Sequence, residues 1–344
     1  MFLAHPNKIM RTALVAAIAF GLCFESIPAS AETKPQIWFS SPPTKDYMKL
    51  FSSPSEWPQS LSQVDVFELQ TQFAVKAGDP MLRTMFNFLG EHHIALALEM
   101  PILTAEPNQC GFGIEGNRPQ GVDKALAERL HRLGAPLKYV AMDEPLWFGH
   151  MSNATKPNGA FPCQATINDV AVNAANNIAA IRSYYPDVIV GDEEPLLNPY
   201  RRNDIPPDFW DQMQAWTKSF GSATGYPLAF IHFDIGWFPS GSASEDVKNH
   251  AHWLAQLQQA QTFTKLNGIR SGIFYNGNPG DKSGVAWDEH AEARFEEVEG
   301  IHHYQFDDVV IQSWMRQPRL DLPETTPGTI SNLLMQYIQF KHFQ

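Results

Sequence analysis

The sequence predicts a single (β/α)8 barrel, in which eight strands alternate with helices. Short apolar runs rich in Val, Ile, Phe and Leu recur along the chain, and amphipathic segments separate them. Consecutive runs begin roughly 27 to 51 residues apart, the length that a strand, a loop and a helix occupy together. An open doubly wound sheet, the main rival, usually carries a glycine-rich turn after its first strand. Here Ser40-Ser41-Pro42-Pro43 stands in that place, so the barrel is favoured.

The apolar runs are expected to form the strands of this barrel. In chain order they are Ile37–Ser41, Val64–Leu69, Ile94–Met100, Leu137–Met142, Val188–Gly191, Leu228–Phe233, Gly272–Tyr275 and Val309–Trp314. Amphipathic periodicity predicts helices over Met81–Leu89, Val122–Leu133, Ile167–Tyr184, Pro207–Phe220, Ser244–Leu266, Asp288–Val298 and Ile330–His342. Glycine or proline commonly stands at the turn from helix to strand, as at Gly134, Pro186, Pro227 and Gly268.

The first 31 residues have the pattern of a secretory signal peptide. Lys8 and Arg11 precede an apolar run, Thr12–Phe24, and Ala29-Ser30-Ala31 offers a small-residue cleavage site. The apolar run is short for a bilayer span, so an anchor is the less favoured alternative. We therefore expect a secreted or periplasmic protein whose barrel occupies residues 32–344.

Charge and composition narrow the possible partners. The chain of 344 residues has 25 Lys and Arg against 37 Asp and Glu, a net charge of −12. Nucleic-acid binding requires clustered cations, so this class of partner is not expected. The sequence is 44% hydrophobic and 18% charged, as in an ordinary folded protein, and we expect a monomer.

Two cysteines remain once the signal segment is removed. Cys110 and Cys163 both lie in loop sequence rich in Gly, Pro and Asn. In an exported chain they are candidates for a disulfide, and two unpaired thiols are the alternative. If joined, they would tie together the loops after the third and fourth strands.

Polar residues collect where the predicted strands end. In a barrel of this kind, the carboxyl ends of the strands surround the active-site mouth. The residues at these ends are Glu68, Glu99, Asp143, Glu144, Asp192, Glu193, Glu194, His232, Asp234, Tyr275, Asn276, Gln312 and Trp314. Glu68 and Glu99 stand in apolar runs, where each is either a functional group or a buried structural carboxylate.

Strand alternation divides the acids of the fifth strand. Asp192 and Glu194 share one parity, so one layout has Glu193 pointing away as an exposed charge. His232 and Asp234 also share a parity and are expected to face the mouth together.

Carboxylates that face each other favour acid–base chemistry on a stable bond. Crowding raises the pKa of at least one carboxyl, which then donates a proton while an ionised partner attacks or activates water. Glycoside hydrolysis uses such a pair. Flat rings near strand ends, at Trp147, Trp237, Trp314 and Tyr275, are suited to stacking on sugars. Any one of them could instead cap the core.

The fourth strand carries a resemblance to a known superfamily. Val140-Ala141-Met142-Asp143-Glu144-Pro145 resembles the (β/α)8-barrel glycoside hydrolases, whose fourth strand commonly ends in Asn-Glu-Pro or Asn-Glu. The resemblance implies that Glu144 is the proton donor and that Asp143 replaces a sugar-contacting Asn. It also implies a glutamate nucleophile ending the seventh strand, but Gly272–Gly277 contains no carboxylate. No specific family is identified.

The second carboxylate must therefore come from another strand. Asp234 is the leading candidate, because other sugar-cleaving barrels pair the fourth strand with the sixth, and Asp192 and Glu194 are the alternatives. We predict an exported glycoside hydrolase without a cofactor, acting on a polysaccharide or oligosaccharide. The predicted substrate-binding residues are Asp143, Glu68, Glu99, Trp147, His232, Trp237, Tyr275, Asn276, Gln312 and Trp314.

Two other functions stay open at this point. One is a metal-dependent hydrolase or isomerase, whose cation would be held by Glu99, Asp192, Glu194, His232 and Asp234. Against it, the sequence has no His-Glu-x-x-His helix. The other is a barrel that binds carbohydrate without cleaving it, and the missing acid on the seventh strand favours that alternative.

Overall fold

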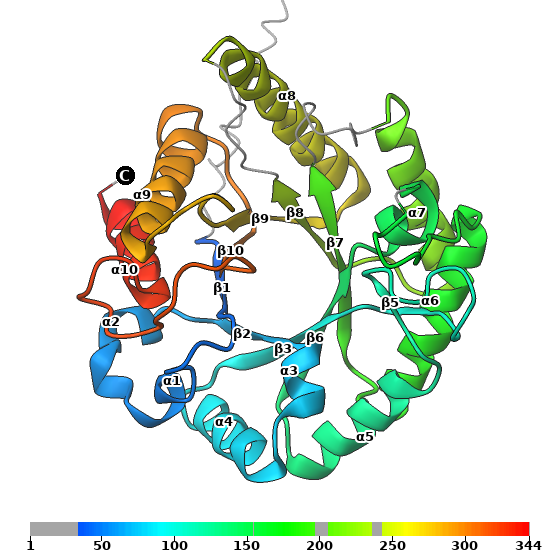
Figure 1. Ribbon diagram of the computed structural model, residues 1–344, viewed down its shortest axis with the longest axis horizontal. Helices are drawn as coiled ribbons and strands as arrows, with labels where there is room; N and C mark the ends of the chain where they lie inside the picture. The colour runs from blue at the N-terminus through cyan, green and yellow to red at the C-terminus, as the bar shows by residue number, and fades with distance from the viewer. Residues whose placement is uncertain (1–33, 154, 197–205, 236–242, 344) are drawn as a thin grey trace, which may run out of the picture. The chain divides into compact units, whose positions relative to one another are not determined.

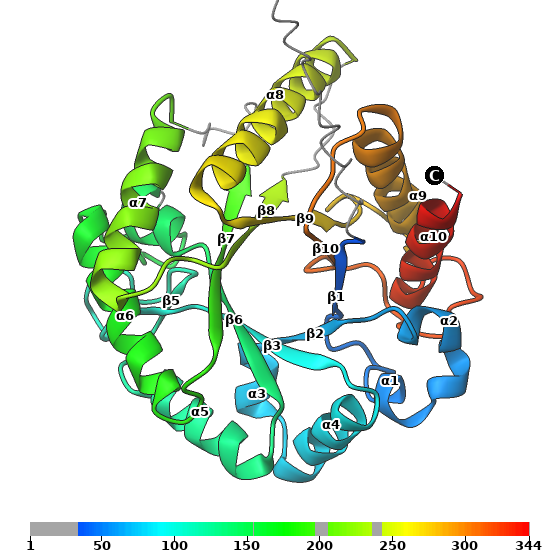
Figure 2. The ribbon, with the colours of Figure 1, turned by 180° about the vertical axis from the view of Figure 1, so that it is seen from behind.

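The computed structural model describes residues 34–343 except 154, 197–205 and 236–242, and only the backbone of 243–252. The predicted signal peptide, residues 1–31, and Trp237 lie outside the described residues. Eight parallel strands close into a barrel with helices around it, so the predicted (β/α)8 fold is confirmed (Figures 1 and 2). Among the helices described, none is long and apolar enough to cross a membrane.

The strands of the barrel follow the predicted runs closely. They are β1 Gln36–Ser40, β2 Val66–Gln70, β3 Ala95–Met100, β6 Leu137–Asp143, β7 Ile189–Leu196, β8 Phe230–Ile235, β9 Arg270–Tyr275 and β10 Asp308–Gln312. Around the barrel, β10 closes on β1, and β6 pairs with β3 on one side and β7 on the other. The clearest difference is β7, which continues to Leu196 rather than ending at Gly191, so its acidic residues lie inside the strand.

Helices surround the barrel and fill the chain between its strands. They are α1 Lys49–Ser52, α2 Pro58–Leu61, α3 Thr71–Lys76, α4 Asp79–Glu91, α5 Val122–Leu133, α6 Ile167–Arg182, α7 Phe209–Thr224, α8 Ala243–Asn267, α9 Gly284–Phe295 and α10 Ile330–His342. All seven predicted helices are present; α1, α2 and α3 are short additions. Helix α5 ends at Gly134, which has φ of 80°, a left-handed conformation that glycine adopts without strain.

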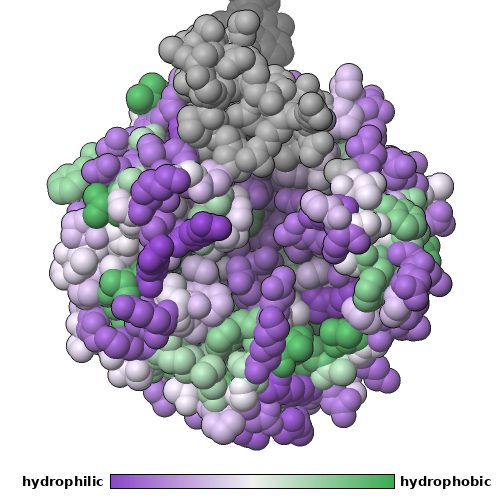
Figure 3. Space-filling model, viewed as in Figure 1, coloured by the Kyte–Doolittle hydropathy of each residue, from purple (hydrophilic) through white to green (hydrophobic). Residues whose placement is uncertain are grey.

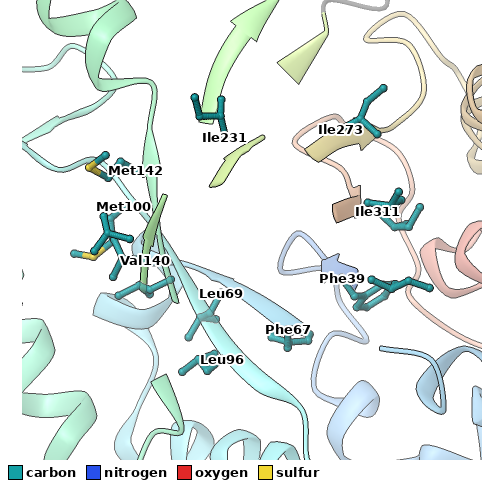
Figure 4. Packing of buried hydrophobic residues seen from close by; sticks show 14 of the residues in the cluster. Phe39, Phe67, Leu69, Leu96, Met100, Val140, Met142, Ile231, Ile273 and Ile311 are labelled. Atoms are coloured by element: carbon teal, nitrogen blue, oxygen red, sulfur yellow. The ribbon is translucent and has the colours of Figure 1, made fainter. Parts of the chain in front are cut away.

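The two faces of the strands pack into separate layers. Outward residues such as Phe39, Leu96 and Ile231 form the main core with the surrounding helices (Figure 4). Inward residues, among them Trp38, Tyr139 and Phe230, form a smaller cluster inside the barrel. Because side chains alternate along a strand, this division assigns every strand residue to one face.

Two inward glycines make room for the aromatic filling of the barrel. A Cβ added at Gly191 would lie 2.3 Å from the Phe230 ring, and one at Gly272 would lie 2.3 Å from Cδ2 of His232. Both separations are far below contact distance, so each glycine is required by the ring beside it.

The loop after β3 covers one side of the mouth. It carries a small parallel pair, β4 Leu103–Thr104 and β5 Asn117–Arg118, in front of α6 in Figure 1. The predicted disulfide is present: Cys110 and Cys163 are joined, 53 residues apart in sequence. It links this loop to the segment that follows β6, as expected for a bridge between the third and fourth strands.

Candidate active site at the carboxyl ends of the strands

The mouth of the barrel lies at the end where α3 follows β2, which faces the viewer in Figure 1. Hydrophilic side chains gather around a hollow in the centre of this face (Figure 3). Alternation from the inward residues Val66, Ala97 and Ala141 places Glu68, Glu99 and Asp143 on the inner surface of their strands. The predicted collection of carboxylates at one end of the barrel is therefore observed.

Two further acids share this inner surface. Glu193 is the register partner of Asp143 on β6 and of His232 on β8, so it faces inward with both. Asp234 follows the inward His232 by two residues and faces the same way. Charges of Asp143 and of Glu115, in the turn between β4 and β5, reach the Asp234 carboxyl.

The outcome for β7 is the reverse of the expected layout. Asp192 and Glu194 point outward, toward the helices, and Glu193 points into the barrel. Trp216 Nε1 on α7 donates a hydrogen bond to Asp192 at 2.5 Å. Glu194 accepts bonds from the amides of Leu146 at 2.7 Å and Trp147 at 3.2 Å. The prediction of Asp192 and Glu194 as catalytic groups is therefore corrected: both are structural acceptors.

Glu144 occupies a strained turn directly after β6. Its φ is +48°, in the left-handed region that non-glycine residues adopt at a cost. Its amide donates to the carbonyl of Glu193 at 3.0 Å, which fixes the turn against β7. The turn interrupts the alternation of β6, and the Glu144 carboxyl, which is half-buried, lies within the electric field of Asp143, Asp234 and Glu115. Such strain is typical of functional positions.

Burial and mutual repulsion raise the pKa values of the mouth carboxyls, but unequally. Burial raises the pKa of Asp234 to about 8, and the charge of Asp143 adds to this effect. The pKa of Asp143 rises to about 7, because the Arg118 guanidinium and the Gly116 amide partly offset its burial. The pKa of Glu144 rises well above its ordinary value through burial and the charges of Asp143 and Asp234. The pKa values of all three carboxyls are therefore raised, which favours retention of a proton in the mouth near neutral pH.

Glu99 lies on β3, the strand next to β6, and contacts Gln312 on β10. Gln312 Nε2 donates to Glu99 Oε2 at 3.0 Å, which links β10 to β3 across the barrel. Burial raises the pKa of Glu99 well above its ordinary value, and the charges of Asp143 and Glu68 raise it further. Glu68 lies below it, fully buried, with a pKa raised to about 7 by burial.

His232 faces inward as predicted, but it lies beneath the mouth rather than in it. Its side chain is fully buried against Trp38 and Phe230, and Nε2 lies 3.3 Å from Asp308 Oδ2. Direct contact with substrate is therefore not expected, and its predicted role in substrate binding is corrected.

The predicted aromatic platform is only partly present. Tyr275 points outward, where its hydroxyl donates to Glu299 at 2.8 Å, so its prediction as a substrate-binding residue is wrong. Its neighbour Asn276 takes the inward parity and is fully buried, and neither of its amide atoms has a partner among the described residues. Trp147 is 8% exposed, and Trp314, just past β10, is 42% exposed. Trp314 remains the stacking candidate.

The residues proposed for a cation do not converge. Asp192 and Glu194 lie on the outer face of β7, and His232 is occupied by Asp308. Among the described residues, no group of three His, Cys, Asp or Glu side chains has a geometry that could hold a metal ion. The metal-dependent alternative, as its ligands were predicted, is not supported.

Sequence reasoning missed Arg118 and Asp308, and it assigned Glu193 to the wrong face of its strand. Arg118, on β5, pairs with Asp123 at 2.8 Å and its charge also reaches Asp143. It lies in a loop that shows no periodic signal. Asp308 precedes the apolar run of β10 and was therefore excluded from it. The inward phase of Glu193 could have been found from Gly191, because an inward glycine fixes the parity of β7.

No protein-family model matches the chain, and no curated protein matches its sequence. Solved structures with a similar fold include the catalytic domain of a β-amylase from Paenibacillus polymyxa, which is 11% identical with a TM-score of 0.49 and is aligned over 89% of this chain and 97% of that chain. A D-psicose 3-epimerase from Clostridium cellulolyticum H10 is 9% identical, TM-score 0.46, over 90% of this chain and 98% of that one. The virulence factor SghA, in complex with its substrate analogue salicin, is 12% identical with a TM-score of 0.44 and is aligned over 78% of this chain and 76% of that chain. These likenesses concern the fold alone.

Proposed function

We propose that this chain is an exported glycoside hydrolase that cleaves a polysaccharide or oligosaccharide at the acidic mouth of its barrel. Glu144 protonates the leaving oxygen, and Asp234 acts as the ionised carboxylate on the other side of the bond. The observation that supports the proposal is the strained turn at Glu144, whose carboxyl lies in the field of Asp234, with the pKa of both carboxyls raised by burial. Glycosidases require this division of roles between two carboxyls.

The other groups of the mouth fit the handling of a polar ligand. Asp143, which accepts a hydrogen bond from the Gly116 amide and lies in the field of Arg118, supplies an acceptor next to the proton donor. Glu99 and Gln312 supply an acceptor and a donor, and Asn276 supplies an amide that has no partner among the described residues. Hydroxyl groups of a sugar both donate and accept, so they match this mixed set. Trp314 offers an exposed ring at the rim.

The decisive experiment is Glu144→Gln, assayed on a glycan that the wild type cleaves. We expect kcat to fall about 100- to 10,000-fold with little change in KM, because a general acid contributes that much. Glu91→Gln, an exposed carboxyl on α4, is the control and should retain full activity. Undiminished turnover in Glu144→Gln would remove Glu144 from the mechanism.

Two measurements complete this test. The anomer first released, followed by proton NMR, distinguishes attack by Asp234 on the sugar from attack by a water that Asp234 activates. A wild type that binds glycans without turnover over long incubation would favour the carbohydrate-binding alternative. For export, amino-terminal sequencing of the mature protein from an expressing culture should begin at Glu32.

A further inference from the structure

A chain of buried polar groups runs beneath the mouth, across four strands. Asp308 on β10, His232 on β8, Glu193 on β7 and Glu68 on β2 all face the barrel interior. Glu193 is 5% exposed and the other three are fully buried. Such groups are costly to bury unless each has a defined partner. Their protonation states are therefore constrained by one another.

Asp308 determines which nitrogen of His232 carries the proton. The Asp308 carboxylate is paired with the Arg270 guanidinium and accepts a bond from Trp38 Nε1 at 3.3 Å. It is thus an acceptor, and His232 Nε2, 3.3 Å away, must donate to it. Burial lowers the pKa of His232, so the ring is neutral and Nδ1 carries a lone pair.

The imidazole is held in one orientation by its neighbours. The Trp38 ring meets the imidazole edge-on, with ring centroids 4.6 Å apart and planes at 87°. The centroid of the Phe230 ring lies 4.5 Å from that of the imidazole. Gly272 leaves the space for Cδ2, because any Cβ there would overlap it. With the ring fixed and Nε2 engaged, Nδ1 is presented to Glu193.

Glu193 lies between this nitrogen and a second carboxyl. Its Oε1 is 4.0 Å from His232 Nδ1. On its other side Glu193 is hydrogen-bonded to the carboxyl of Glu68, which requires one shared proton. Neither oxygen of Glu68 meets a donor from any other described group. The other carboxyls that act on the pair are Glu99 on β3 and Asp143 on β6, and a negative charge on either raises the pKa of Glu193.

We propose that Asp308 and His232 are positioning residues that keep the shared proton of the Glu68–Glu193 pair on Glu193. A lone pair at Nδ1 disfavours negative charge on Oε1 and favours a neutral Glu193, whose hydroxyl then donates to Glu68. Glu68 becomes the member of the pair that ionises.

The consequence for catalysis rests on the proposed function. A neutral Glu193 withholds one negative charge from Asp143, its register partner, and so helps the carboxylates of the mouth to ionise. Without the Asp308–His232 arrangement, Glu193 would ionise and the mouth carboxyls would be harder to deprotonate.

The first test needs no variant and no substrate. Nitrogen-15 NMR of histidine-labelled full-length protein reports which ring nitrogen is protonated, and His232→Gln identifies the resonance. We expect a neutral ring protonated at Nε2 at neutral pH, since burial lowers the pKa of His232. An imidazolium, or a ring protonated at Nδ1, would overturn the proposal.

The second test alters the hydrogen bond between Asp308 and His232. Asp308→Asn offers an amide donor to Nε2, so the His232 proton should move to Nδ1 and donate to Glu193. In the wild type, the infrared band of the protonated Glu193 carboxyl is identified as the one that Glu193→Gln removes. At neutral pH this band should also be missing from Asp308→Asn. The acidic limb of kcat/KM should move up by about half to one pH unit, because the negative charge of the pair moves from Glu68 to Glu193, the register partner of Asp143.

A purely structural role makes a different prediction. Asp308→Asn would then lower stability but leave the tautomer, the infrared band and the pH limb unchanged, and that result would refute the proposal. If Asp308→Asn does not fold, the wild-type NMR measurement still decides. If no glycan is cleaved at all, the proposed function fails, while the NMR and infrared results judge this inference separately.

Discussion

Carboxyl groups on the two faces of the same strands meet opposite environments. The outward acids Asp192 and Glu194 each accept hydrogen bonds from a tryptophan ring or from backbone amides. Among the described residues, the inward acids Glu68 and Glu193 are bonded to each other, and Asp234 Oδ1 meets no donor, as is also true of one oxygen of Asp192. Outward carboxyls therefore complete the packing of barrel and helices, whereas inward carboxyls are left for one another and for a ligand.

This difference separates structural acids from functional ones more sharply than burial does. Asp192 and Glu68 are both fully buried, and burial raises the pKa of both. The outward one accepts from an indole N–H, which repays part of its desolvation, whereas the partner of Glu68 is another carboxyl. A folded chain that keeps several unsatisfied carboxyls around one hollow retains a cost that a bound ligand can relieve.

The largest expected effect is on catalysis by an inward acid. Asp234→Asn should lower kcat/KM at least about 100-fold, because it removes the ionised partner of Glu144. In the wild type, kcat/KM should rise with pH through about 8, since burial raises the pKa of Asp234 to about 8 and the base must be deprotonated. This limb should be absent from the residual activity of Asp234→Asn.

The outward neighbour provides the control for that result. Glu194→Gln keeps an oxygen acceptor for the Leu146 amide and should lose far less activity than Asp234→Asn. Equal losses of activity in Asp234→Asn and Glu194→Gln would contradict the division between inward functional acids and outward structural acids.

The next effect is on the pH dependence of stability. Burial raises the pKa of Glu68 from 4.5 to about 7, so the folded state binds this proton more tightly than the unfolded state does. Its stabilising contribution is complete below about pH 4.5 and is lost as the pH rises through about 7. The free energy of unfolding should fall by about 1.4 kcal/mol per pH unit for this proton.

Urea unfolding between pH 5 and 7 measures this slope. Glu68→Gln should flatten it by the contribution of one proton, whereas the exposed Glu91→Gln should leave it unchanged. A slope that is the same in wild type and Glu68→Gln would mean that Glu68 is not the group that holds the proton.

Periodicity was sufficient to predict the barrel but not the phase of each strand. The runs ending at Met100 and Met142 predicted β3 and β6 closely, because apolar content alone identifies a strand buried on both faces. For β7, apolar content gave the wrong end of the strand. The acidic residues Asp192–Glu194 suggest that the strand has ended, but β7 continues to Leu196 and stays paired with β8. The three acids alone also do not show which of them face the barrel interior and which face the helices.

The site was predicted in part for the same reason. Glu144, Asp143 and Asp234 follow apolar runs directly, so their place at the mouth was accessible from the sequence. The partners of the inward acids are distant in sequence: Asp308 is 76 residues from His232, and Gln312 is 213 from Glu99. Closure of the barrel, not local pattern, brings these residues together.

A smaller effect is expected where an outward acid loses its donor. Trp216→Phe removes the indole that donates to Asp192 and leaves a buried carboxyl oxygen without it, at a cost of about 1–3 kcal/mol. Activity per folded molecule should be unchanged, because the outward face does not meet substrate. Trp210→Phe, which removes a donor to the half-buried Gln256, is the matched control and should cost less. Lost turnover in folded Trp216→Phe would contradict the structural role of Asp192.

The smallest effect contrasts two adjacent residues at the end of β9. Tyr275→Phe removes one hydroxyl from Glu299, which keeps its bonds from Tyr337 and, at 3.1 Å, from Lys341. The loss should be about 0.5–1.5 kcal/mol of stability with kcat/KM unchanged. Asn276→Ala, one residue on and facing inward, should instead raise KM while costing little stability, because its amide has no described partner to lose. A raised KM in Tyr275→Phe would show that the outward face reaches the substrate after all, and the distinction between the two faces of the barrel would fail at this strand.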